Sequence, residues 1–183
     1  MGVTVDWRFE LPVSARTAWA AFSDTDRFNR AAGLGFTFTE EAQPDGSVLR
    51  RGQVRKLGMN LVWDELPWEY EAPRWFRIRR RFHSGPLGHL EVNCRIEGDE
   101  SRCEARYTVT LYPRAPWWHP VVWADAQTAV KPQLGSALGR LTALLRGDAV
   151  QYDPPPPRLD ADTVSRLESS LSKLSQQRVA QGL

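Results

Sequence analysis

The sequence predicts an α+β fold in which a curved antiparallel sheet wraps around one long C-terminal helix. Residues 3–11 (VTVDWRFEL) alternate apolar and polar, which is typical of a half-buried strand. Residues 36–113 contain short strand-like runs separated by tight turns, with no helical pattern between them, which favours an antiparallel meander. Residues 120–147 carry apolar side chains every three or four positions, as one face of a helix does.

Each element follows from a local signal. Ser14 can cap a helix over residues 15–22, and Gly33 can end a second short helix directly after it. In the long helix, Gly147 suits the end, and Pro132 should introduce a kink. The strands expected after the two short helices span 36–41, 48–57, 59–66, 75–82, 88–97 and 102–112.

The C-terminal part differs in composition from the rest of the chain. We expect residues 1–147 to form one domain, 148–159 a proline-rich linker, and 160–183 a short helix. That helix carries a leucine seam of about two heptads, which is too short to be stable alone. It should therefore pack on a partner, for example in a homodimer, or lead into a downstream domain. The seam consists of Val164, Leu167, Leu171 and Leu174.

The composition excludes several classes of protein. The 183 residues include 24 Lys and Arg and 22 Asp and Glu, and this balance does not indicate nucleic-acid binding. No apolar run approaches the ~18 residues of a membrane span, and no signal-peptide pattern is visible, so we expect a cytoplasmic protein. Cys94 and Cys103 should be small buried hydrophobes, with Cys103 opposite Ile96 in a hairpin. Neither metal-ligand spacing nor a phosphate-binding loop is present, so no metal or cofactor is expected.

The stretch WFRIRRRF, residues 75–82, places a guanidinium on an apolar face. As a strand, it puts Arg80 on the same side as Ile78 and Phe82. A buried guanidinium must be paired, and Glu65 is the candidate because it has the inward parity of its own strand. Two interpretations remain open. Arg80 is either structural, paired with Glu65 or reaching the rim with its stem buried, or it is an anchor for a ligand carboxylate or phosphate.

The remaining arginines of this region point the other way. They form either a basic stripe for single-stranded nucleic acid or a solvated sheet face paired with acids. Acidic residues interleave the same strands, which favours the second interpretation, so no nucleic-acid partner is expected. The arginines concerned are Arg77, Arg79 and Arg81, with Arg50, Arg51 and Arg55 on a strand expected to be adjacent.

Two segments, LPVSARTAWAAFSDTDRFNR and WDELPWEYEAPRWFRIRRRF, resemble the START-like superfamily, also called SRPBCC. The resemblance covers residues 3–147 and implies the helix-grip fold, with a cavity between the sheet and the long helix. Such a cavity would bind a small, largely apolar or amphipathic ligand. The residues expected to bind it are Arg80, Glu65, Trp63, Phe76, Ile78, Phe82, Tyr107, Val109, Leu134 and Leu138.

Four shorter stretches, SDTDRFNRAAGL, WDELPWEY, FHSGPLG and YPR, are similar to the N-terminal START-like domain of some bacterial adenylate/guanylate cyclases. This similarity implies a non-catalytic regulatory module ahead of a cyclase catalytic domain. Trp117 and Trp118, just before the long helix, are expected at the rim of a pocket opening, where they would serve a hydrophobic ligand or a docking partner. One alternative to the regulatory module is an interaction module whose small cavity is fully plugged by tryptophans, of which the sequence has eight. The other is a stand-alone polyketide cyclase/aromatase-like enzyme, with acid–base candidates Glu65, Arg80, Tyr107 and Asp125.

Overall fold

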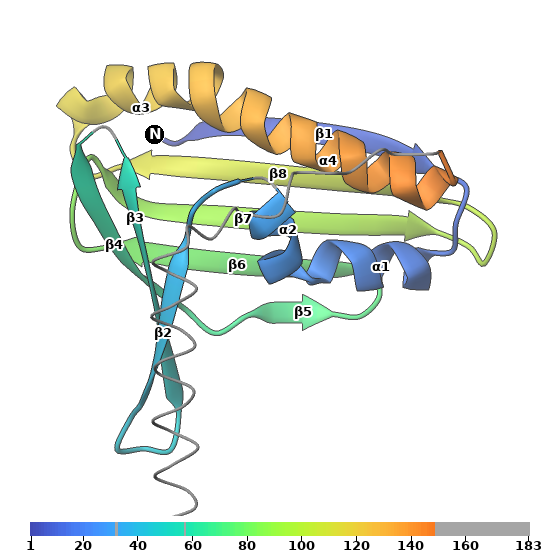
Figure 1. Ribbon diagram of the computed structural model, residues 1–183, viewed down its shortest axis with the longest axis horizontal. Coiled ribbons are helices and arrows are strands. Elements are labelled where there is room, and N and C mark those ends of the chain that lie inside the picture. The colour runs from blue at the N-terminus through green and yellow to red at the C-terminus, as the bar shows by residue number, and fades with distance from the viewer. Residues whose placement is uncertain (32, 57, 149–183) are drawn as a thin grey trace, which may run out of the picture. The chain divides into compact units, whose positions relative to one another are not determined.

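The computed structural model describes residues 1–31, 33–56 and 58–148, and Figure 1 shows their arrangement. Eight strands form one antiparallel sheet in the order β1-β8-β7-β6-β4-β3-β2, with β5 beside β6. The long C-terminal helix and the two short helices cover one face of this sheet. The predicted α+β fold is therefore confirmed. Apart from Asp148, the predicted linker and leucine-seam helix lie outside the described residues.

The strands follow the predicted meander with one addition. The strand β5 was not predicted, because its three residues, EYE, show no apolar alternation; it is defined by pairing with β6, where Tyr70 lies opposite Phe76. The strands are β1 (Val3–Leu11), β2 (Thr37–Ala42), β3 (Val48–Lys56), β4 (Met59–Glu65), β5 (Glu69–Glu71), β6 (Trp75–Phe82), β7 (Leu87–Gly98) and β8 (Cys103–Pro113).

The two short helices, α1 (Ala15–Ser23) and α2 (Thr25–Ala31), lie where the sequence predicts them. Ser14 caps α1, since its Oγ accepts a hydrogen bond from the Thr17 N–H at 3.2 Å. Asp24 plays the same part for α2, accepting from the Arg27 N–H at 3.0 Å. These caps fix the point at which the chain crosses from β1 onto the face of the sheet.

The long helix is a composite of three segments that follow a single 3₁₀ turn, η1 (Pro116–Trp118). They are α3 (His119–Asp125), a π-helical segment η2 (Ala126–Val130) and α4 (Lys131–Arg146). Pro132 has no N–H, and its ring crowds the carbonyl one turn earlier, so the wider π turn directly before it accommodates the proline. None of the described helices is both long and apolar enough to cross a membrane.

The core lies between the helices and the inward face of the sheet. The predicted alternation is confirmed in β8, where every second residue from Cys103 to Leu111 is buried, and in β6, where Arg80 is buried beside Ile78 and Phe82. Both cysteines are free and buried, as predicted. The expected hairpin register was wrong by two residues, because Cys103 pairs with Gly98 and Ile96 with Ala105. A shift of two leaves every side chain on its predicted face.

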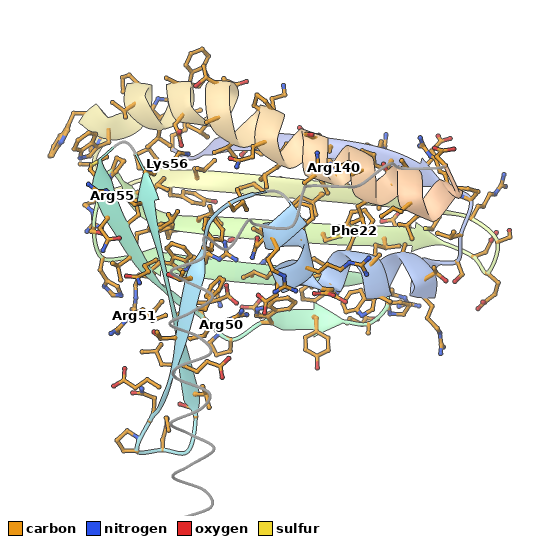
Figure 2. The ribbon with its side chains drawn as sticks, viewed as in Figure 1. Phe22, Arg50, Arg51, Arg55, Lys56 and Arg140 are labelled. Carbon is orange, nitrogen blue, oxygen red and sulfur yellow. The ribbon has the colours of Figure 1, made fainter. Side chains whose placement is uncertain are left out.

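The outward face of the sheet is a network of ion pairs, which confirms the preferred interpretation of its arginines. Arg79 pairs with Glu69, and Arg77 lies 3.6 Å from Glu91. Arg50 does not belong to this face. It extends to the opposite side of β3 from Arg51 (Figure 2), and β3 is separated from β6 by β4 rather than adjacent to it.

Candidate functional site

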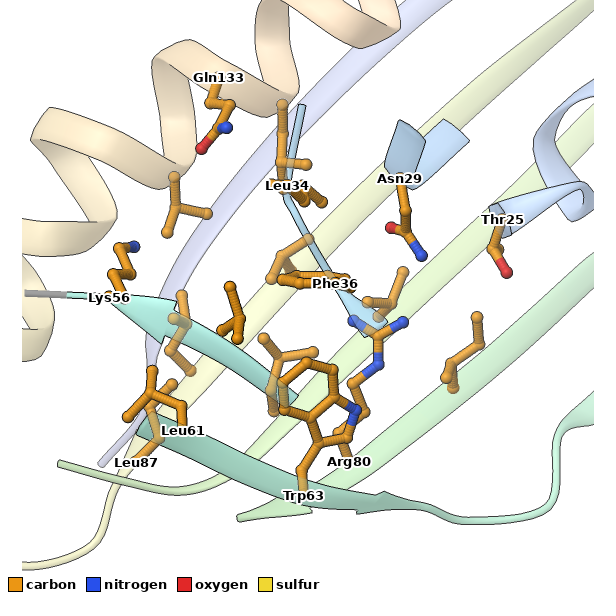
Figure 3. Close-up of a pocket in the computed structure, with 18 of the residues that line it drawn as sticks. Thr25, Asn29, Leu34, Phe36, Lys56, Leu61, Trp63, Arg80, Leu87 and Gln133 are labelled. Carbon is orange, nitrogen blue, oxygen red and sulfur yellow. The ribbon is translucent and has the colours of Figure 1, made fainter. Parts of the chain in front are cut away.

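A cavity of about 310 Å³ lies between the inward face of the sheet and the helices. Its walls come from α2, the loop before β2, strands β3, β4, β6, β7 and β8, and the long helix (Figure 3). Most of its lining is aliphatic or aromatic, and its volume is at the lower end of the range for small-molecule sites. Its existence contradicts the hypothesis of a fully plugged interior.

Seven of the ten predicted ligand-binding residues line this cavity. Glu65 does not line the cavity, although it is hydrogen-bonded to Arg80, which does. Phe76 instead packs against Trp19 and Trp68, with ring centroids 5.7 and 5.6 Å away, and Leu138 is fully buried within the core. The periodicity of a strand or helix marks its inward face but cannot distinguish packed positions from positions beside empty space. The seven are Trp63, Ile78, Arg80, Phe82, Tyr107, Val109 and Leu134.

Arg80 is held rigidly in the cavity wall. Its Nε donates a hydrogen bond to Glu65 Oε2 at 2.9 Å, and the residue is only 6% exposed. Its guanidinium carbon lies 5.3 Å from the Phe36 ring centroid and 5.6 Å from that of Trp63, within cation–π distance. The ion pair with Glu65 and the packing against two rings therefore fix the direction of the guanidinium.

Glu65 is fully engaged in this positioning. Besides Arg80, its carboxylate accepts hydrogen bonds from Arg50 Nη1 at 3.3 Å and from Trp68 Nε1 at 3.1 Å. Arg50 in turn pairs with Asp26 of α2. The two arginines and two acids balance in charge, so the burial of Arg80 is compensated without any ligand.

The far side of the Arg80 guanidinium is uncommitted. Neither Nη atom donates a hydrogen bond to any residue that the structure describes, and both point into the cavity (Figure 3). One geometry therefore accommodates both interpretations of Arg80, the structural ion pair with Glu65 and the anchor for a ligand. Glu65 holds the Nε side, and the Nη side is available for an acceptor within the cavity.

Two polar residues of α2, Thr25 and Asn29, also line the cavity and were not predicted. They are four residues apart and share the face of α2 that carries Phe28, which was the available signal. Tyr107 lines the same space. Burial raises the pKa of Tyr107 well above its ordinary value, although Arg80 lowers it, so its hydroxyl stays protonated and can donate.

The other side of the cavity is closed by polar contacts between elements. Lys56 Nζ of β3 lies 2.8 Å from the carboxylate of Asp125 in α3, and Gln133 Nε2 of α4 donates to the Gly33 carbonyl at 3.2 Å. In Figure 3, Lys56 and Gln133 lie away from Arg80. The four acid–base candidates therefore do not converge, because Asp125 is paired with Lys56 rather than placed beside Arg80.

The tryptophans contribute little to the cavity. Trp63 is the one tryptophan found in its wall among the described residues, and Trp117 is 75% exposed on the turn before α3. The rim role predicted for Trp117 and Trp118 is not seen, since neither lines the cavity. The described part of the chain also holds no group of three His, Cys, Asp or Glu side chains suited to a metal ion.

An antiparallel sheet that grips a long C-terminal helix around a cavity defines the START-like, or SRPBCC, class of helix-grip proteins. Within that class, the chain belongs to the family described as polyketide cyclase / dehydrase and lipid transport, whose model matches residues 3–146. No curated protein matches the sequence.

Solved structures share the fold at low sequence identity. The Zhui aromatase/cyclase from Streptomyces sp. R1128 has a TM-score of 0.58 at 16% identity, covering 84% of this chain and 100% of its own. TTHA0849 from Thermus thermophilus has a TM-score of 0.53 at 13% identity, covering 81% and 100%. A START superfamily protein from Mycobacterium smegmatis has a TM-score of 0.51 at 20% identity, covering 77% and 98%. At such identities the likeness concerns the fold alone.

Proposed function

We propose that the cavity binds a small, largely apolar ligand whose one polar end accepts hydrogen bonds from Arg80. The observation that carries this proposal is the asymmetry of the guanidinium. Its Nε is fixed on Glu65 at 2.9 Å, while both Nη atoms face the cavity without a partner among the described residues. An acceptor oxygen of the ligand would satisfy the hydrogen-bonding capacity of the Nη groups, and the rest of the ligand would pack against the apolar walls.

The structure favours binding over turnover. The family and the aromatase/cyclase neighbour make an aromatase-like enzyme compatible with the fold. A general base would have to be near the anchored end of the ligand, however, and the acid found in the described cavity wall, Asp125, is tied to Lys56 at 2.8 Å. If the purified chain converted a substrate into an aromatic product, the enzyme would be favoured over the binding protein.

A regulatory position ahead of a nucleotide cyclase remains a hypothesis that rests on the sequence resemblance alone. Its transmitter, the seam from Val164 to Leu174, lies outside the described residues, as does the surface through which two copies would pair. Reading the codons that follow Leu183 tests it, because a catalytic domain with paired metal-binding aspartates must be encoded there.

Substitution of Arg80 tests the binding proposal. Arg80→Met should weaken the binding of octanoate, used as a probe, by about tenfold or more, because hydrogen bonds to a charged group are lost. Arg80→Lys should recover little, because an ammonium cannot reproduce the planar fork that reaches both Glu65 and the ligand. Isothermal titration calorimetry measures both affinities.

The matched control is Arg79→Met, one residue along β6 and on the outward face, where Arg79 pairs with Glu69. It should leave octanoate binding unchanged. Equal affinities for wild type, Arg80→Met and Arg79→Met would contradict the assignment of Arg80 as the anchor.

A further inference from the structure

The helix α2 presents two buried polar side chains to the cavity. Thr25 is 7% exposed and Asn29 8% exposed, and Figure 3 shows both extending from α2 on the side of the cavity where Arg80 lies. The Nδ2 of Asn29 is buried and has no hydrogen-bond partner among the described residues. A buried amide without a partner is destabilising, so such groups are rare unless something outside the chain satisfies them.

The surroundings of Asn29 are rich in donors. Arg80 extends from β6 of the sheet towards α2 and contributes two Nη groups without a hydrogen-bond partner among the described residues, which can only donate. Thr25 and Tyr107 line the same space, and each carries a hydroxyl, a group that can donate as well. The carboxylate that could compete for these donors, Glu65, is already engaged by Arg50, Arg80 and Trp68.

We propose that Thr25 and Asn29 form a second anchoring subsite, so that the bound molecule carries a head with two acceptor oxygens, such as a carboxylate. One oxygen accepts from Arg80 and the other from Asn29. This inference rests on the proposed function and deepens it by naming the chemistry of the head group. It also predicts rejection of amine heads, which would leave the donors of the site unpaired.

Three probes of equal chain length test the inference: octanoate, with two acceptor oxygens; octan-1-ol, with one oxygen; and octylamine, a donor head. Wild-type protein should bind octanoate most tightly and octylamine least. Asn29→Leu should weaken octanoate by about tenfold, the effect of one hydrogen bond between an amide and a carboxylate, and change octan-1-ol by less than about threefold. Calorimetric titration gives the affinities.

Two further variants serve as a second test of the subsite and as a control. Thr25→Val removes a hydroxyl from the same subsite without changing side-chain shape and should weaken octanoate in the same selective manner. Asn60→Leu makes the same exchange on β4 at an exposed residue outside the cavity, and should change none of the affinities. Because Asn29→Leu removes an unpaired amide, its melting temperature should not fall, which separates lost recognition from lost folding.

The outcomes separate the inference from the function on which it rests. Selective loss of octanoate in Asn29→Leu and Thr25→Val supports the two-oxygen head. Equal loss of octanoate and octan-1-ol, or no loss of either, overturns the subsite and leaves Arg80 as the sole anchor. Failure of wild-type protein to bind any of the three probes overturns the proposed function itself.

Discussion

At the scale of single residues, the shape of the cavity depends on a glycine. Gly52 of β3 lies directly opposite Trp63 of β4, and a Cβ at Gly52 would be 2.2 Å from Cε2 of the indole. The indole therefore packs directly against the backbone of Gly52. Its ring centroid lies 5.0 Å from that of Phe36, and the guanidinium carbon of Arg80 lies 5.6 Å from the Trp63 ring centroid. Gly52 allows Trp63 to serve as a wall of the cavity rather than as a side chain that fills it.

Replacement of this glycine should be costly. Gly52→Ala should lower the free energy of unfolding by about 1–3 kcal/mol, because the indole must leave its position in a packed core. It should also weaken octanoate binding, since Trp63 would be displaced from the cavity wall. Chemical denaturation measures the first effect and calorimetry the second.

The control is Gly139→Ala in α4, where an added Cβ meets nothing within 4 Å. It should raise the free energy of unfolding by about 0.5–1 kcal/mol, as expected for alanine in a helix interior. If Gly52→Ala were as stable as wild type, the close packing of Trp63 on β3 would be refuted.

At the scale of elements, a buried carboxylate on the outward face joins the strands that support the cavity. Asp64 of β4 accepts from Arg51 Nε of β3 at 2.9 Å and lies 2.7 Å from Nε2 of His83, which follows β6. Burial raises the pKa of Asp64, but the hydrogen bonds from Arg51 and His83 outweigh it, so the pKa lies below its ordinary value. The inward neighbour Glu65 thus sits on a strand anchored from both faces.

The lowered pKa of Asp64 makes the free energy of unfolding depend on pH. A carboxylate with a lowered pKa in the folded state stabilises it above the unfolded pKa of about 4, and this contribution disappears as the pH falls through the folded value. Asp64→Asn should therefore be less stable than wild type by about 1–3 kcal/mol near neutral pH, and the difference should shrink towards about pH 3.

Urea denaturation at the two pH values measures this difference. Asp6→Asn, at an exposed position 3.9 Å from Arg106, should change stability little at either pH. A deficit in Asp64→Asn that stays constant with pH would show that the carboxylate charge is not what joins these strands.

At the scale of the whole molecule, the sequence predicted the order of elements and the inward side of each long strand. Alternation in β8 and β6 sufficed, because a side chain's face depends only on parity, and this also placed Arg80 inside. The strand β5 could not be predicted, since three polar residues pair only because β6 is beside them. The π-helical segment before Pro132 is likewise a response of the assembled helix to the proline.

The candidate site was predicted less completely than the fold. Residues on regular strands, such as Trp63 and Arg80, were found by parity. Asn29 was missed because its one signal, the four-residue spacing from Thr25 on the Phe28 face, is weak in a short helix of mixed polarity. Whether an inward position faces a cavity or packed side chains depends on three-dimensional contacts, as Phe76 and Leu138 show.

The central claim, that the cavity of about 310 Å³ holds a small ligand anchored by Arg80, is tested most directly by native mass spectrometry. The mass of the purified chain is compared before and after denaturation, with and without millimolar octanoate. The account predicts an extra small-molecule mass that is lost on denaturation and reduced in Arg80→Met. The bare chain mass under every condition, octanoate included, would contradict it.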